Sequence, residues 1–243
     1  MDQSEFESYA HPAEEWTSYV RQNGLPPFLR YNSSKQAIDS QTITNAARLK
    51  ASRDFWLNFT LTDNIDIKTF VFSASDSQEI SSRVYRPKNA HPKAVLLYFH
   101  GGGFCSGTLT SEDPTCIHLA QTCGITIVSI NYRHTPQWTC PTPFQDAWDA
   151  RNWVLHSHDQ HHLPFNMDLY VAGTSSGACL AASIVTRERL ESTPTIKGQA
   201  LWCPWLCLPQ SFLLHEFAAP ELASSRQSDS RRSSESYYQP SIG

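Results

Sequence analysis

Two uninterrupted apolar runs constrain the fold of this chain more than any other feature of its sequence. They cover residues 94–99 (AVLLYF) and 125–130 (ITIVSI), and a shorter run covers 169–172. A strand that is buried on both faces has this continuous pattern, whereas a strand with one solvated face alternates. Residues 113–123, between the first two runs, have helical spacing. We therefore expect an α/β protein with βαβ units and a mostly parallel, doubly wound sheet.

Shorter patterns complete the expected order of elements. Apolar residues recur at 65–72 and at 80–85, on either side of a serine-rich turn, which predicts two strands. Residues 144–155 place apolar side chains at i, i+3, i+4 and i+7 and predict an amphipathic helix after Pro143. The remaining expected elements are helices that begin after Ser40 or Thr44, a helix at 178–190 and a sixth strand at 198–202.

Composition divides the chain into three expected parts. Residues 1–60 are polar with scattered aromatic side chains and predict an N-terminal helical cap. Residues 61–210 carry the strand and helix patterns of the α/β core. Residues 211–243 form a divergent tail rich in serine and arginine, whose few aliphatic side chains cannot offset the entropy of ordering, so we expect disorder there.

Charge and length exclude several classes of protein. The 243 residues include 19 basic and 23 acidic side chains, a net charge of −4, which argues against a nucleic-acid-binding protein. The apolar runs are far shorter than the ~20 residues that span a bilayer, so we expect no membrane span. The first residues show no secretory signal, and the seven cysteines are an odd number, so the expected location is cytoplasmic.

The segment Gly173-Thr174-Ser175-Ser176-Gly177 matches G-x-S-x-G and lies between a short strand and an alanine-rich helix. In that context the pattern predicts a nucleophile elbow, in which the chain nearly reverses and holds the serine hydroxyl exposed. The two glycines remove Cβ atoms that would clash with the neighbouring strand and helix. The helix N-terminus places positive potential where negative charge develops. Ser175 is therefore the candidate nucleophile.

The segment His100-Gly101-Gly102-Gly103 directly follows the first buried strand. Three glycines allow backbone N–H groups to turn toward a bound anion, such as the tetrahedral oxyanion of acyl transfer. Gly102 and Gly103 would each supply one N–H group and Ser176 a third. Phosphate binding is a poorer explanation, because no G-K-[S/T] follows. The coincidence of the two motifs predicts the two halves of one oxyanion site.

Three segments in this order carry a family resemblance: residues 100–107 (HGGGFCSG), 131–136 (NYRHTP) and 173–177. Together they resemble the hormone-sensitive-lipase-like branch of the α/β-hydrolases, which contains carboxylesterases, arylacetamide deacetylases and plant gibberellin receptors. The resemblance extends from about residue 65 to 205. It implies an α/β-hydrolase fold with an N-terminal helical cap, no cofactor, and hydrolysis of a small-molecule carboxylic ester.

The resemblance also implies roles for the motif residues. Ser175 corresponds to the nucleophile, and the oxyanion donors are Gly102, Gly103 and Ser176. His100 corresponds to a structural residue that braces the glycine loop, and Gly101, Gly173 and Gly177 shape the two turns. The sequence departs from the family at Thr174, where an acidic residue is usual, and at Gln137, where glutamate is common.

The rest of a catalytic triad is missing from its expected place. In this fold the order is serine, then an acidic residue, then histidine. After Ser175 the only aspartate is Asp229 and the only histidine is His215, which is the wrong order. Of the 68 residues after Ser175 (243 − 175), the elbow helix and the sixth strand use those to about Leu206, and the rest leave no room for two further strand–helix units of ~30 residues each. We expect a truncated core with its last strands missing and an impaired proton relay.

Three interpretations of the chain follow. The first is a serine ester hydrolase that works through an acyl-Ser175 intermediate and is impaired by the absent aspartate and histidine. The second is a non-catalytic, receptor-like protein that binds a small molecule on the same scaffold. The third is a poorly folding remnant. The sequence predicts neither a nucleic-acid partner nor a membrane partner and leaves the oligomeric state open.

Other motifs predict less. His158 and His162 have i, i+4 spacing, and Cys203 and Cys207 form C-x3-C, but neither set has the further ligands of a metal site, so we expect no metal. Five further side chains are not expected to be catalytic. Cys105 is expected to pack, and Asp146 and Asp149 are expected to act on the helix dipole. Trp202 and Trp205 are expected in the core or in a pocket wall.

Overall fold

The computed structural model describes residues 14–24, 33–58, 64–88, 92, 94–156, 163 and 167–206. Its elements, in chain order, are α2 (Glu14–Asn23), α3 (Ser34–Asn58), β1 (Ile65–Ser73), β2 (Glu79–Pro87), β3 (Ala94–Phe99), η1 (Thr110–Glu112), α4 (Asp113–Cys123), β4 (Thr126–Ile130), α5 (Thr142–His156), β5 (Asp168–Thr174), α6 (Ser176–Leu190) and β6 (Ile196–Trp202). The chain divides into two units, residues 1–39 and 40–243. The cap at 1–60 stays a prediction, and the tail at 211–243 lies outside the described residues.

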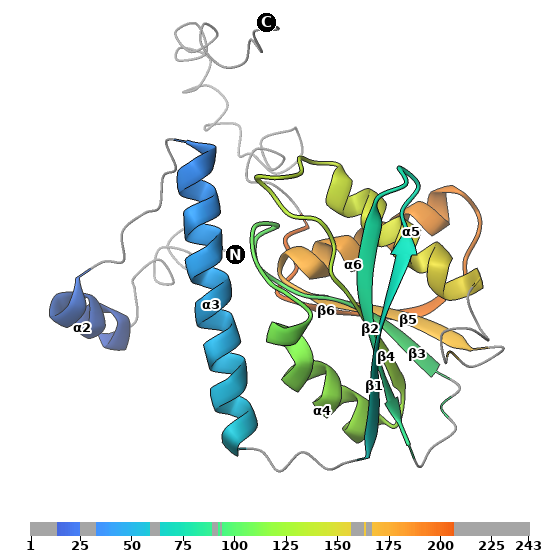
Figure 1. Ribbon diagram of the computed structural model, residues 1–243, viewed down its shortest axis with the longest axis horizontal. Helices are drawn as coiled ribbons and strands as arrows, with labels where there is room; N and C mark the ends of the chain where they lie inside the picture. Colours follow the sequence, from blue (N-terminus) through green and yellow to red (C-terminus); the bar gives the residue numbers. More distant parts are fainter. Residues whose placement is uncertain are drawn as a thin grey trace, which may run out of the picture. The chain divides into compact units, whose positions relative to one another are not determined.

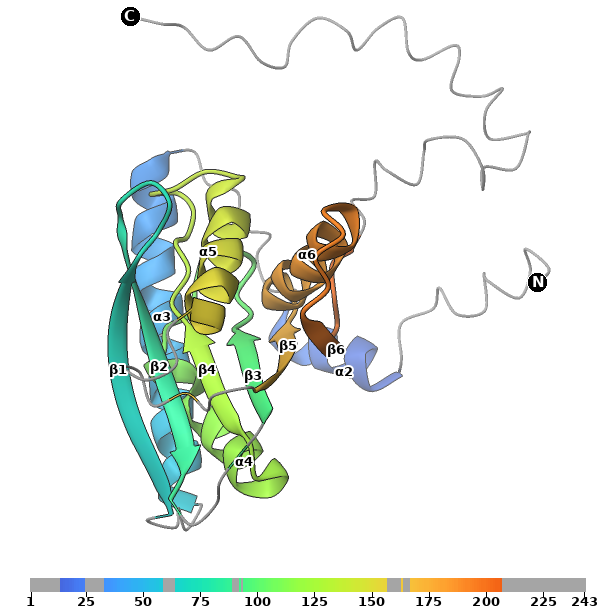
Figure 2. The same ribbon diagram turned by 90° about the vertical axis from the view of Figure 1, so that its right-hand side faces the viewer.

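The described strands form one sheet (Figure 1). Their order is β1-β2-β4-β3-β5-β6, from left to right in Figure 2. Strands β4, β3, β5 and β6 are parallel to one another, which confirms the parallel part that the continuous apolar runs predict. Strands β1 and β2 form an antiparallel hairpin, and β2 joins β4 antiparallel, so the sheet is mixed. The order and directions of the strands agree with the α/β-hydrolase fold that the resemblance implies.

Each face of the sheet carries its own apolar core, because successive side chains of a strand point to opposite faces. In β3, Leu97 and Phe99 belong to the cluster that packs against α5 and α6. Their neighbours Leu96 and Tyr98 belong to the cluster that packs against α4. The helices accordingly lie on both sides of the sheet (Figure 2). This two-sided burial explains why the sequence of β3 is apolar without interruption.

Two expectations about helices need correction. Helix α3 begins at Ser34, earlier than the expected starts after Ser40 or Thr44, because its residues lack the apolar stripe that marks a helix in sequence. Asp146 does not act mainly on the helix dipole: it is fully buried, and it accepts hydrogen bonds from the backbone N–H and the guanidinium of Arg133. Asp149 accepts bonds from the backbone and hydroxyl of Ser75.

No helix within the described residues has the length and hydropathy that a membrane crossing requires.

The Arg133–Asp146 pair yields a stability prediction. The Arg133 side chain is 9% exposed and the Asp146 side chain is not exposed at all, so Asp146→Ala leaves a buried guanidinium short of its main partner. We expect a loss of about 3 kcal/mol in the free energy of unfolding, measured by urea titration. Glu191→Ala removes the exposed pair with Arg187 and is expected to cost less than about 1 kcal/mol. Equal losses in the two variants would contradict the prediction.

Candidate active site

Ser175 is the only residue between the end of β5 and the start of α6, so the turn predicted from G-x-S-x-G is present. Its backbone has φ 53° and ψ −117°, an uncommon conformation for a residue with a side chain. Such strain persists where the surrounding structure determines it and is typical of functional turns. The Ser175 N–H donates to the carbonyl of Trp202 in β6 over 2.8 Å, which holds the turn from one side.

The glycines of this turn leave no space for side chains. A Cβ on Gly177 would lie 2.1 Å from the carbonyl oxygen of Phe99, and one on Gly173 would lie 2.3 Å from the carbonyl of Gly177. The first turn of α6 therefore touches both its own strand and the end of β3. This close approach agrees with the spatial role that the sequence predicts for both glycines.

The strand register brings the two motifs together. Strands β3 and β5 are parallel neighbours in which Phe99 pairs with Gly173, so the chain leaves both strands at the same level of the sheet. A Cβ on Gly101 would lie 3.5 Å from the Cβ of Ser175 and 2.9 Å from the carbonyl oxygen of Thr174. The glycine loop thus lies directly beside the elbow.

The glycine loop has the backbone freedom that its sequence predicts. Gly102 has φ 142°, and a Cβ there would lie 1.9 Å from the carbonyl oxygen of Ser106. The Gly102 carbonyl accepts hydrogen bonds from the N–H groups of Cys105 and Ser106. Among the described residues, the N–H groups of Gly102 and Gly103 donate to no other backbone group outside the helices and strands. Their role as oxyanion donors stays a prediction.

Ser176 begins α6, where the first N–H groups of a helix have no intrahelical partner. Its side chain is buried, and its hydroxyl lies 3.3 Å from the hydroxyl of Tyr132. The Tyr132 hydroxyl donates to the carbonyl of His100 over 2.8 Å. Tyr132 therefore connects the start of the elbow helix to the start of the glycine loop, a role that the sequence alone did not assign to it.

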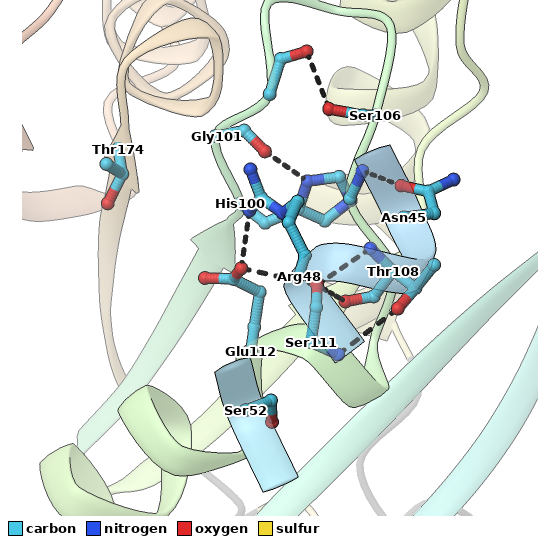
Figure 3. Close-up of polar contacts among 12 residues, drawn as sticks. Asn45, Arg48, Ser52, His100, Gly101, Ser106, Thr108, Ser111, Glu112 and Thr174 are labelled. Carbon is cyan, nitrogen blue, oxygen red and sulfur yellow. Dashed lines mark hydrogen bonds and ion pairs between the residues drawn. The ribbon is translucent and has the colours of Figure 1, made fainter. Parts of the chain in front are cut away.

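His100 is fully buried beneath the glycine loop (Figure 3). Its Nδ1 lies 3.0 Å from the carbonyl oxygen of Gly101, so Nδ1 carries the proton and donates. The ring stacks on Tyr132 with centroids 4.5 Å apart, and Gly107 packs so closely that a Cβ there would lie 2.2 Å from Nδ1. This environment fits the bracing role that the resemblance implies for His100.

A second imidazole, that of His134, lies beside the first, with ring centroids 5.1 Å apart. Burial lowers the pKa of His100 to about 4 and that of His134 to about 3, and the positive charge of Arg48 contributes to both shifts. Both rings are neutral at pH 7. The Nε2 atoms of both are buried without a hydrogen-bond partner among the described residues.

Helix α3 supplies further contacts that sequence reasoning missed. The Asn45 side chain accepts a hydrogen bond from the N–H of Gly107 over 2.8 Å, and Arg48 forms an ion pair with Glu112 at 2.7 Å (Figure 3). Ser52 donates to the carbonyl of Thr110. These partners are about 60 residues apart in sequence, so no local pattern signals them.

No triad partner of Ser175 is found among the described residues. The histidines that the structure describes are His100, His118, His134 and His156, and none of the hydrogen bonds within the described part of the chain joins an imidazole or a carboxylate to the Ser175 hydroxyl. Asp229 and His215 lie outside the described residues. The absence of a relay therefore stays a prediction from the sequence.

The described residues contain no group of three metal ligands. Cys203 is exposed, and His158, His162 and Cys207 lie outside the described part of the chain. Cys105 is exposed as well, with its Sγ 3.0 Å from the Thr135 hydroxyl, so the expected packing role is wrong for this side chain.

A cavity of about 940 Å³, with a wall that is mostly carbon, opens beside the glycine loop. Gly103 and Phe104 line it from that loop, Trp148 from α5, and Cys179 from α6, one turn after Ser175. Trp205 is another wall residue and Trp202 lines a second cavity, so both tryptophans belong to pocket walls and not to the core. A concave apolar surface of this size suits the apolar part of a small molecule.

Comparison with known proteins decides the family. A family model described as the alpha/beta hydrolase fold matches residues 96–239, which is more than half of the chain. The chain belongs to the α/β-hydrolase family.

Individual members of the α/β-hydrolase family show how far the similarity extends. Esterase LipI of Mycobacterium tuberculosis is 38% identical over 138 residues, which are 54% of this chain and 42% of that protein. Gibberellin receptor GID1B of Arabidopsis thaliana is 34% identical over 105 residues, 42% of this chain and 29% of the receptor. The chain thus spans less than half the length of these curated relatives.

A solved esterase has a similar fold. The esterase of Pyrobaculum calidifontis has a TM-score of 0.63 and 26% identity, and the superposition covers 79% of this chain and 59% of that one. The relatives include esterases and a receptor, so membership in the family supports an esterase-like scaffold in general.

The contact at Gly177 predicts a large mutational effect. Gly177→Ala places a Cβ against the backbone of Phe99, which cannot move without disturbing β3. We expect a loss of about 3 kcal/mol in the free energy of unfolding. Gly124→Ala is the matched control, because Gly124 has φ 65° with open space around it and is expected to lose only about 1 kcal/mol. Urea titration measures both losses, and equal effects would contradict the prediction.

The two buried imidazoles predict a pH dependence of stability. Their pKa values are lowered in the folded chain, so below pH 6.5 the unfolded chain binds more protons and stability falls. His100 alone is expected to contribute a loss of about 2 kcal/mol between pH 7 and pH 5, before most carboxylates titrate.

Urea titrations at several pH values measure this slope. His134→Gln is expected to reduce this slope, because it removes one of the two buried imidazoles. A free energy of unfolding that stays constant from pH 7 to pH 5 would show that the imidazoles are not buried as described.

Proposed function

We propose that this chain carries the nucleophile and oxyanion site of a serine ester hydrolase. The observation that supports the proposal most is the position of Ser175 at a strained strand–helix turn, with Gly101 of the triple-glycine segment packed beside its Cβ. An acyl-transfer site needs a hydroxyl next to a set of N–H donors. Because the chain spans only part of its relatives, the activity and the substrate remain parts of the proposal.

The chemistry follows from these groups. The Ser175 oxygen attacks the ester carbonyl carbon as its proton passes to a base, and the carbonyl oxygen becomes an oxyanion. The N–H groups of Gly102, Gly103 and Ser176 are the proposed donors to that oxyanion. The C–O bond to the alcohol then breaks, and the alcohol leaves with a proton. Water attacks the acyl-serine in the same way, releasing the acid and restoring the hydroxyl.

The proton acceptor limits the expected rate. None of the histidines that the structure describes hydrogen bonds to Ser175, and His100 is held on the carbonyl of Gly101. Enzymes that lose triad members retain ~10³–10⁴-fold acceleration over water from the oxyanion site and from binding. We therefore propose slow hydrolysis of small or medium esters, with the carbon-lined cavity beside Gly103 holding an apolar part of the substrate. The proposed reaction uses no cofactor or metal.

A fluorophosphonate probe tests the proposal. The probe forms a covalent bond to an activated serine, and we expect labelling that maps to Ser175 by peptide mass spectrometry. Ser175→Ala is expected to abolish both labelling and the hydrolysis of p-nitrophenyl acetate above the buffer rate. Ser81→Ala, in β2, is the control and is expected to retain both. Robust hydrolysis that persists in Ser175→Ala would contradict the proposed role of Ser175.

A receptor-like binder is the second candidate. It is favoured by the 34% identity to a gibberellin receptor and by the unpartnered hydroxyl of Ser175 within the described residues. Saturable binding of a small molecule without labelling of Ser175, measured by calorimetry, would support this candidate over the hydrolase.

A further inference from the structure

A chain of polar contacts, buried at its centre, connects helix α3 to the elbow. Arg48 forms an ion pair with Glu112 over 2.7 Å, and the Tyr98 hydroxyl donates to the other carboxylate oxygen of Glu112 over 3.2 Å. The same tyrosine hydroxyl lies 3.2 Å from the hydroxyl of Thr174, the residue directly before Ser175. Figure 3 shows Arg48 reaching Glu112 from α3. These four residues are called the elbow relay below.

The direction of each hydrogen bond in the elbow relay follows from the number of protons. A tyrosine hydroxyl has one proton, and Tyr98 gives it to Glu112, so the Thr174 hydroxyl must donate to Tyr98. Burial raises the pKa of Tyr98, and the charge of Glu112 contributes, so the phenol keeps its proton. The orientation of the Thr174 hydroxyl is therefore determined by a carboxylate on the other side of Tyr98.

Burial restricts the hydrogen-bond partners that the side chains of the elbow relay can choose. Tyr98 is 1% exposed and Glu112 is 9% exposed, so water competes poorly for their polar atoms. A buried carboxylate needs a charged partner and hydrogen bonds, which Arg48 and Tyr98 supply. The loss of one member leaves another without its partner, and such losses are costly at low dielectric.

The elbow relay ends at Thr174, whose position determines that of Ser175. The carbonyl of Thr174 packs against Gly101, so a shift of Thr174 changes both the elbow and the glycine loop. Ser175 is held on its other side by the carbonyl of Trp202. The strained backbone of Ser175 is thus fixed between β6 and the elbow relay. A displacement of about 1 Å in such a site can cost ~10²-fold in rate.

We propose that Glu112 is a positioning residue for Ser175, acting through Tyr98 and Thr174 and held in place by Arg48 on α3. The catalytic part of this inference rests on the proposed function. Its geometric part concerns only the position of the elbow. If Tyr98 had a purely structural role, removal of its hydroxyl would have the same effect on the elbow as removal of another buried hydroxyl of the same core.

Tyr85 provides the comparison that separates these roles. It is fully buried in the same core as Tyr98, and its hydroxyl donates to Asp113, the residue after Glu112. It makes no contact with Thr174 in the described structure. Tyr98→Phe and Tyr85→Phe therefore remove chemically equal groups from the same core, and only the first interrupts the elbow relay.

Two measurements test the proposal on Tyr98→Phe, Thr174→Val and Glu112→Ala, with Tyr85→Phe as control. Hydrogen–deuterium exchange of a peptide covering 173–179 reports the elbow itself, and the rate constant of fluorophosphonate labelling reports the reactivity of Ser175. We expect exchange to rise and labelling to slow about tenfold in the first three variants and neither to change in the control. Glu112→Gln keeps an acceptor for Tyr98 and is expected to restore part of the labelling rate. The Tyr98→Phe/Thr174→Val double variant is expected to equal the slower single variant, because both remove the same link.

The outcomes separate this inference from the proposed function. If the natural chain is not labelled but Tyr98→Phe raises elbow exchange and Tyr85→Phe does not, the elbow relay stands and the ester-hydrolase proposal fails. If labelling occurs but the two tyrosine variants behave alike in both measurements, the elbow relay is overturned. Thr174→Val, at a half-buried position, keeps the test valid should Tyr98→Phe not fold.

Discussion

The site depends on one steric constraint, the contact between the start of α6 and the end of β3. Gly177 lies so close to the Phe99 carbonyl that no side chain fits between them. Because Phe99 pairs with Gly173 across β3 and β5, both chains leave the sheet at one level, and α6 must begin against the end of β3. This packing places Ser175 beside the glycine loop. A wider separation of α6 and β3 would leave the same residues without a common site.

The sequence predicts those parts of this arrangement that a short stretch of residues specifies. The continuous apolar run at β3 identifies a two-sided buried strand, and a glycine pattern between a strand and a helix identifies the elbow. The start of α3 at Ser34 has no such signal, because that helix lacks an apolar stripe. A dipole argument gives the wrong role for Asp146 because it considers only the helix of that residue, whereas the partner Arg133 comes from the loop after β4.

The polar contacts around the site could not be predicted for a related reason. Asn45 and Arg48 resemble ordinary surface residues of a polar helix, and their partners Gly107 and Glu112 are 62 and 64 residues away. One signal was present: a tyrosine within a buried apolar strand needs a partner for its hydroxyl. The sequence therefore predicts a buried polar group next to Tyr98, but it does not identify that group as Glu112.

Fixed dipoles, and not net charges, dominate the electrostatics of the described site. The two imidazoles nearest the glycine loop are neutral at pH 7, and the charge of Arg48 is balanced by Glu112. An oxyanion at this site would be stabilised by backbone N–H groups and by the N-terminus of α6, which do not titrate. The proposed oxyanion site would thus keep its donors at any pH at which the fold is stable. The pH dependence of the proposed ester hydrolysis would then report the pKa of the group that accepts the Ser175 proton, and such a profile would identify the base more directly than any change in the glycine loop.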